Sequence, residues 1–151
     1  DNTDAEGRLT LADALCYACE LNVDEVIDIA TLTGACVVAL GSHISGIMGN
    51  DDCFVEKLIE TGKDAGEKMW KLPMDKEYFD SLKSDIADMK NTGSRMGGAS
   101  AAGVFLQEFV DGPKWAHIDI AGTAYIEKPQ KEFIAGATGA GVRTLLSYVT
   151  K

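Results

Sequence analysis

The chain has 151 residues and a formal net charge of -10, with 46% hydrophobic residues, 16 glycines and 3 prolines. This composition is typical of a globular domain and excludes a collagen-like or disordered chain. The sequence has no apolar run of the roughly 18 residues that a membrane-spanning helix needs, and no basic stripe of the kind that binds nucleic acid. We therefore expect one globular domain with no membrane contact.

Hydrophobic periodicity predicts helices and strands that alternate along the chain. Helices are predicted at residues 9–21, 34–40, 52–68, 75–82, 101–110 and 142–149. Strands or extended segments are predicted at residues 26–31, 44–48, 71–74 and 115–121, and glycine-rich loops at 89–100 and 136–141. This alternation predicts an α/β fold with a central mixed sheet flanked by helices on both faces.

The cysteine pattern favours reduced thiols. Cys16 and Cys19 form a C-x-x-C pair inside the first predicted helix, whereas a redox or zinc-ribbon motif needs a turn, and a ribbon needs a second pair. We expect these two residues to be buried, reduced thiols, which fits a reducing cytosol. A redox protein that uses the pair remains an alternative, which alkylation of the native thiols would test.

The opening segment, residues 2–8 (NTDAEGR), is the first candidate site. In an extended backbone Asp4 and Glu6 would project to the same side, and paired carboxylates suit divalent cations. A guanidinium at Arg8 could bind an anion or a developing oxyanion. The residues alone also allow a structural interpretation, in which Thr3 or Asp4 caps the next helix and Arg8 makes a surface ion pair.

A second candidate lies at residues 30–34 (ATLTG), where a predicted strand gives way to a helix. Open α/β sheets bind ligands at the carboxyl ends of their strands, and threonine hydroxyls there could align a peptide. An ordinary turn, with each threonine hydrogen-bonded locally, is the alternative.

A third candidate is the H-x-D pattern of His117 and Asp119, which the alternation of a strand places on one face. Such a pair could serve a metal ion or acid–base chemistry, but a single histidine on a strand is more often a hydrogen-bonded structural residue. A serine hydrolase is excluded, because the sequence around Ser42 lacks the G-x-S-x-G elbow.

Six ordered blocks over essentially the whole chain carry a family resemblance. They are NTDAEGRL (2–9), LADAL (11–15), DIATLTGA (28–35), NTG with a following GG (91–98), WAHIDIAG (115–122) and TGAGVRTL (138–145). The chain thereby resembles the leucyl aminopeptidase family, the M17-type cytosolic metallopeptidases. The resemblance implies a two-metal aminopeptidase that releases N-terminal residues, such as leucine, from peptides with metal-activated water as nucleophile.

The resemblance also assigns roles to residues of the opening segment. It implies that Asp4 binds one metal ion, that Glu6 bridges both, and that Arg8 holds a bicarbonate ion acting as general base. The two divalent ions would be Mn or Zn, with Mg or Co able to substitute.

The substrate would meet two further segments. The residues implied to line its site are Thr31, Leu32, Thr33, Gly34, Ala121 and Ala124. Some family members carry methionine where Ala124 stands, so alanine there should widen the pocket.

The family's remaining metal ligands belong to motifs that precede NTDAEGR. Residues 1–151 are therefore expected to be the C-terminal portion of one catalytic domain, with a sheet incomplete at its N-terminal side. We expect the chain to be inactive alone, and to need the upstream half of the domain as its partner. At full length the resemblance implies a cytoplasmic homo-hexamer acting on peptides.

The alternative function is a non-enzymatic scaffold or DNA-binding relative of the same fold. The net charge of -10 argues against nucleic-acid contact through this region.

Overall fold

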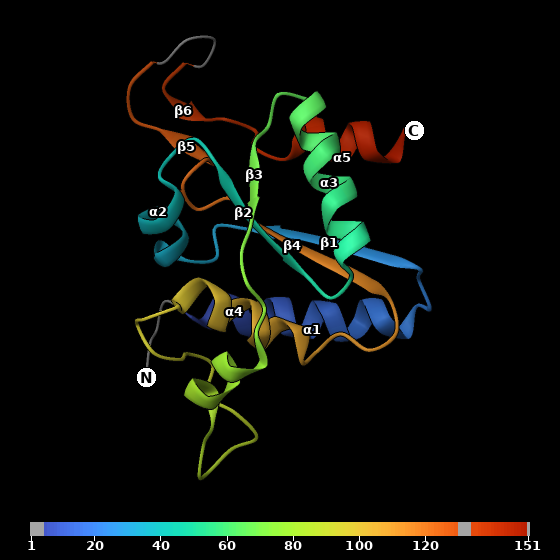
Figure 1. The fold of residues 1–151 in the computed structure, drawn as a ribbon, viewed down its shortest axis with the longest axis vertical. Helices are drawn as coiled ribbons and strands as arrows, with labels where there is room; N and C mark the ends of the chain where they lie inside the picture. The colour runs from blue at the N-terminus through green and yellow to red at the C-terminus, as the bar shows by residue number, and fades with distance from the viewer. Residues whose placement is uncertain (1–4, 130–133, 151) are drawn as a thin grey trace.

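The helices and strands come from a computed structural model that describes residues 5–129 and 134–150 (Figure 1). The helices are α1 (Glu6–Glu20), α2 (Gly34–Leu40), α3 (Asp52–Asp64), the 3-10 helix η2 (Lys76–Leu82), α4 (Gly98–Gln107) and α5 (Val142–Val149). The strands are β1 (Glu25–Ala30), β2 (Ser45–Gly49), β3 (Met69–Lys71), β4 (Lys114–Asp119), β5 (Tyr125–Ile126) and β6 (Gly136–Ala137). In this part of the chain, no helix is long and apolar enough to cross a membrane.

The main sheet is mixed and has the strand order β1-β4-β2-β3. Strands β1 and β4 are parallel, β2 and β3 are parallel, and β2 runs antiparallel to β4. A separate antiparallel hairpin joins β5 to β6. The predicted α/β fold with a central mixed sheet is therefore confirmed.

Helices cover both faces of the sheet, as predicted (Figure 1). Alternation along β4 sends Trp115 into one core and Ile118 into the other. The first core, under α1, α4 and η2, is built from Ala12, Leu15, Leu82, Val104, Phe105, Leu106 and Trp115. The second core, under α3 and α5, is built from Ile47, Phe54, Val55, Leu58, Met69, Ala116 and Ile118.

Several local predictions needed correction, and one hairpin was missed. The backbone at Glu6 is helical, not extended, because α1 begins there and continues through good helix formers. Helix α3 ends at Asp64, four residues early, since Gly66 adopts a φ of 78°. Residues 76–82 form a 3-10 helix. The β5–β6 hairpin was not predicted, because strands of two residues carry no periodic signal.

The parallel pairing of β1 with β4 determines where the candidate segments meet. The register places Ala30 opposite Asp119, so both strands end at the same edge of the sheet. The segments that follow, residues 31–34 and 120–124, therefore leave the sheet side by side, as open α/β sheets arrange their ligand-binding loops.

Candidate active site

Arg8 lies in the first turn of α1 and is half-buried. Its Nη1 donates to the main-chain carbonyl of Asn91 at 2.5 Å, and its Cζ lies 5.9 Å from the centre of the Phe105 ring. Its Nε is buried and has no hydrogen-bond partner among the described residues. Burial lowers the pKa of the guanidinium, while the negative charge of Asp119 opposes that shift. A half-buried cation whose Nε–H has no partner among the described residues is suited to an anion.

Among the described residues Arg8 makes no surface ion pair, and its guanidinium instead turns inward to Asn91 O and the Phe105 ring. The residue at the N-cap of α1 is Ala5, whose side chain makes no capping hydrogen bond, and the proposed caps Thr3 and Asp4 lie outside the described residues. Glu6 is exposed in the first turn of the helix. Asp4 lies outside the described residues.

A cavity of about 170 Å³ brings Arg8 together with the second candidate segment. It is lined by Ala5, Gly7, Arg8, Leu11, Ala30, Thr31 and Leu32. The start of α1 and the end of β1, far apart in the sequence, thus share one hollow. The volume suits a small anion or one end of a peptide, not a whole large ligand.

Thr33 holds the turn between β1 and α2. Its hydroxyl accepts from Cys36 N at 3.0 Å as the N-cap of α2, and donates to Asp119 Oδ2 at 2.7 Å. The side chain is buried, so its hydroxyl serves the local structure. Thr31 and Gly34 on either side are exposed, which leaves them accessible to a ligand.

Ala121 and Ala124 follow the end of β4 and are half-buried. Ala121 N donates to Asp119 Oδ1 at 3.1 Å, which ties this residue to the Thr33 turn. Ala124 N donates to Ile120 O at 2.9 Å, and Ala124 O accepts from Thr138 N, the residue after β6, at 3.0 Å. Among the described residues that line the cavity, neither alanine appears, and neither do Thr33 and Gly34.

His117 is completely buried and pairs through Nδ1 with Asp28 Oδ1 at 2.5 Å. The other Asp28 oxygen accepts from Trp115 Nε1 at 2.6 Å. This arrangement supports the structural interpretation of the histidine, although its Nε2 has no partner within the described part of the chain. Asp119 was predicted only as the partner of His117 in the H-x-D pattern. The alternation of β4 did place it on the face of His117, but no pattern revealed its contact with the Thr33 turn.

The described residues do not by themselves form a metal site. Nowhere in the described ranges do three histidine, cysteine, aspartate or glutamate side chains gather closely enough to hold an ion. Of the two expected ligands only Glu6 is described, and a single exposed carboxylate does not bind a metal ion firmly.

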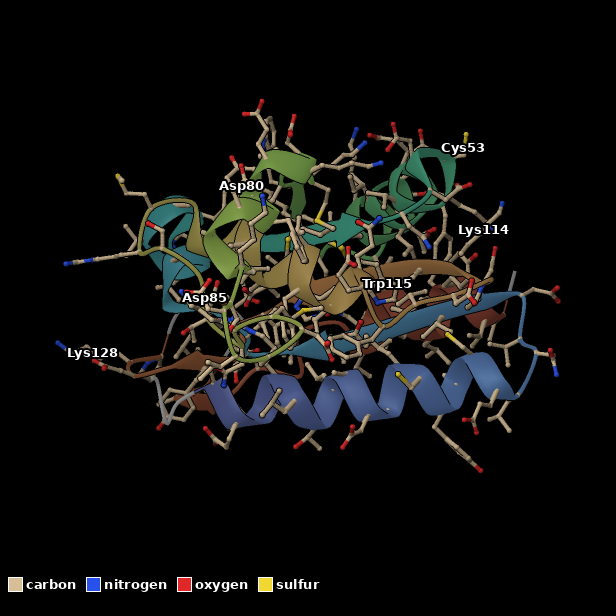
Figure 2. All side chains as sticks on the ribbon, turned by 90° about the horizontal axis from the view of Figure 1, so that it is seen from below. Cys53, Asp80, Asp85, Lys114, Trp115 and Lys128 are labelled. Atoms are coloured by element: carbon tan, nitrogen blue, oxygen red, sulfur yellow. The ribbon has the colours of Figure 1, made fainter. Side chains whose placement is uncertain are left out.

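The cysteines are free thiols with unequal exposure. Cys16 is exposed and Cys19 half-buried, so the predicted burial of the C-x-x-C pair is wrong, because this side of α1 faces solvent. Cys53 projects outward from α3 (Figure 2). Cys36 is buried beside Asp119, and burial together with that charge raises the pKa of its thiol to about 11.

Comparison with known proteins identifies the family whose sequence and fold this chain shares. Residues 1–146 match the cytosol aminopeptidase family, catalytic domain. A probable cytosol aminopeptidase of Synechococcus elongatus is 54% identical over 149 residues, covering 99% of this chain and 31% of the relative. That of Prochlorococcus marinus is 53% identical over 152 residues, covering 100% and 31%.

A solved structure shows the same fold. A mutant of tomato leucine aminopeptidase superposes with a TM-score of 0.92 at 47% identity, covering 98% of this chain and 29% of that one. The chain thus spans about 30% of the length of the relatives it matches. With nearly its whole length matched by the family's catalytic domain, the chain belongs to the cytosol aminopeptidase family.

Proposed function

We propose that this chain is the C-terminal portion of the catalytic domain of a two-metal aminopeptidase, which releases N-terminal residues such as leucine from peptides. The observation that carries the proposal is the cavity shared by Arg8, Thr31 and Leu32, in a chain that the family matches over residues 1–146. Two segments that the family resemblance assigns to catalysis and to substrate binding line that one cavity.

Arg8 is the proposed binding residue for bicarbonate, and the fit rests on its own surroundings. Its Nε is buried and has no partner among the described residues, while Asn91 O and the Phe105 ring hold the rest of the guanidinium in place. Bicarbonate bound there would supply a proton acceptor. The chain's own contribution is a fixed cation that holds the anion beside the cavity.

Members of the family use divalent metal ions, and Asp4 and Glu6 are the proposed ligands contributed by this chain. The described residues do not complete a site, so we derive no metal-dependent step from them. We expect Mn or Zn in the complete protein, with Mg or Co as substitutes. The missing ligands would come from the upstream half of the domain, so the chain alone is expected to be inactive.

Thr31, Leu32, Gly34 and Ala121 are the proposed contacts of the peptide's first residue and backbone. Thr31 and Leu32 line the cavity, and Gly34 is exposed beside them, with open space where a Cβ atom would stand. Thr33 would act through the turn that it holds. Ala124 would border the side-chain pocket, where its small side chain leaves room for a large first residue.

The complete protein is proposed to work in the cytoplasm as a homo-hexamer. The relatives described above are cytosol aminopeptidases by name, which supports the location. The hexamer rests on the family resemblance.

The test is an aminopeptidase assay on the full-length protein that contains this chain, purified with Mn or Zn. We expect release of the N-terminal residue from a leucine-initiated peptide, and none from the same peptide with an acetylated N-terminus. Dialysis against a chelator should abolish the release, and the 151-residue chain alone should show none. A full-length, metal-loaded protein that left both peptides intact would refute the proposal.

A further inference from the structure

Asp119 is the last residue of the central strand β4, and its side chain is completely buried. Its carboxylate accepts three hydrogen bonds. Oδ1 accepts from Leu32 N and from Ala121 N, each at 3.1 Å, and Oδ2 accepts from the Thr33 hydroxyl at 2.7 Å. A buried carboxylate is costly unless such donors surround it, so the three bonds and the nearby Arg8 charge explain why it is tolerated.

The three donors belong to two segments that border the candidate site. Leu32 and Thr33 follow β1, whereas Ala121 follows β4, and Leu32 also lines the Arg8 cavity. One carboxylate therefore ties together the two segments that leave the sheet edge where the parallel strands end. Asp119 itself is not among the described residues that line the cavity, and the three hydrogen bonds to its carboxylate all come from protein groups.

We propose that Asp119 is a positioning residue, which holds the Leu32 and Ala121 segments in the arrangement that receives the substrate beside Arg8. The inference rests on the proposed aminopeptidase function. It adds a residue that acts through the segments it binds and takes no part in the chemistry itself.

The chain offers a matched control in Asp28. This carboxylate lies on the same face of the sheet, in the neighbouring strand β1, and also accepts from buried donors. It pairs with His117 Nδ1 and Trp115 Nε1, both within the sheet. Within the described structure no hydrogen bond joins Asp28 to residues 31–33 or to Ala121. Loss of its charge should therefore weaken the fold without moving the site.

The experiment compares Asp119→Asn and Asp28→Asn in the full-length, metal-loaded protein. Asparagine matches aspartate in shape, and its oxygen can still accept the two N–H groups. Its amide nitrogen, however, faces the Thr33 hydroxyl, which donates to Asp119 and already accepts from Cys36 N. The turn must then rearrange, and the neutral side chain no longer offsets the Arg8 charge.

Two readouts separate positioning from general destabilisation. A merely destabilised enzyme loses folded molecules and hence apparent kcat, whereas a displaced substrate segment raises KM. We expect Asp119→Asn to raise KM for a leucine-initiated peptide about tenfold, because small displacements of positioning groups carry large kinetic costs. Hydrogen exchange at the Leu32 and Ala121 amides should accelerate in Asp119→Asn and keep its wild-type rate in Asp28→Asn.

An unchanged KM in Asp119→Asn, or wild-type exchange at both amides, would overturn the inference. So would an equal rise of KM in Asp28→Asn. If the wild-type protein released no residue at all, the proposed function would fail, and the exchange rates alone would decide whether Asp119 holds the two segments.

Should Asp119→Asn fail to fold, Thr33→Val and Thr33→Ser provide a second comparison. Valine removes the hydroxyl that bonds Asp119, whereas serine keeps it. We expect a higher KM with valine than with serine. Equal KM values for the two variants would refute the inference.

Discussion

Two carboxylates, Asp119 and Glu67, accept the same set of hydrogen bonds in different parts of the molecule. Asp119 accepts two backbone N–H groups and one hydroxyl at the edge of the sheet. Glu67 likewise accepts from Gly141 N at 3.0 Å, Thr144 N at 2.8 Å and Thr144 Oγ1 at 2.6 Å. Each carboxylate thus joins segments that are distant in the sequence.

The difference lies in what the bonded segments border. Glu67 supplies the N-terminal cap of α5, because the residue at its N-cap, Gly141, has no side chain to do so. One of the segments bound by Asp119 instead lines a cavity beside the half-buried cation of Arg8. A multiply bonded carboxylate is therefore no sign of function by itself. The segments around such a carboxylate decide whether it stabilises a helix end or positions a functional site.

The largest expected effect comes from removing the positive charge of Arg8, the cation near Asp119. Arg8→Met in the full-length protein should lower kcat about 100-fold, the usual scale for losing a group that supports proton transfer. Arg143→Met is the matched control, because Arg143 Nε lies 3.6 Å from Glu67 Oε1 on the other carboxylate. Its kcat should stay within about twofold, since surface pairs contribute little. Steady-state kinetics on a leucine-initiated peptide measure both values of kcat. Similar losses of kcat in the two variants would show that the two carboxylate regions do not differ in function.

Removing the second carboxylate should affect stability alone. Glu67→Ala leaves three donors at the start of α5 without their acceptor, and should lower the free energy of unfolding by about 3 kcal/mol. Glu60→Ala, on the exposed side of α3, should change it by less than about 0.5 kcal/mol. Urea unfolding of the full-length protein gives both values. A raised KM in Glu67→Ala would show that this carboxylate also serves the site.

A glycine pair tests how tightly the Glu67 region is packed. Gly141 has a φ of 87°, and a Cβ atom there would collide with Ile29 Cδ1. Gly139 has a φ of 70°, but the nearest atom to a Cβ there, Val142 Cγ2, would be 3.9 Å away. Gly139→Ala should cost about 1 kcal/mol for the left-handed backbone, and Gly141→Ala about 2 kcal/mol because of the added clash. Equal decreases in the free energy of unfolding, measured with urea, would mean that the Ile29 side chain moves aside at no energetic cost.

Thiol labelling disturbs the molecule least and reports directly on Asp119. With the pKa of Cys36 at about 11, only about one molecule in a thousand carries the Cys36 thiolate at pH 8. Iodoacetamide should therefore label the exposed Cys16 and Cys53 first. The charge of Asp119 contributes to raising this pKa, so Asp119→Asn should lower the pKa and speed the labelling of Cys36. Peptide mass spectrometry measures the order in which the cysteines are labelled. Labelling of Cys36 in the wild type before Cys16 and Cys53 would contradict this prediction.

The sequence predicted the elements better than it predicted their ends or their contacts. Residues 34–40 and 142–149 were predicted as helices with the observed bounds, because the first is a small apolar stretch directly after a strand and the second follows a glycine-rich loop. The start of α1 and the β5–β6 hairpin were missed. A helix that opens without a capping side chain and strands of two residues leave no local signal.

What the sequence determined by itself was the family, through its ordered blocks, and the α/β class, through alternating periodicity. Only the tertiary structure decided that Arg8 turns inward to the Asn91 carbonyl, and that Asp119 accepts a hydrogen bond from Leu32 N. These contacts join residues that are 83 and 87 positions apart. Local pattern reports which side of a strand or helix a residue occupies, whereas the partner it meets depends on strand order and register. That information resides in the packing of the whole sheet.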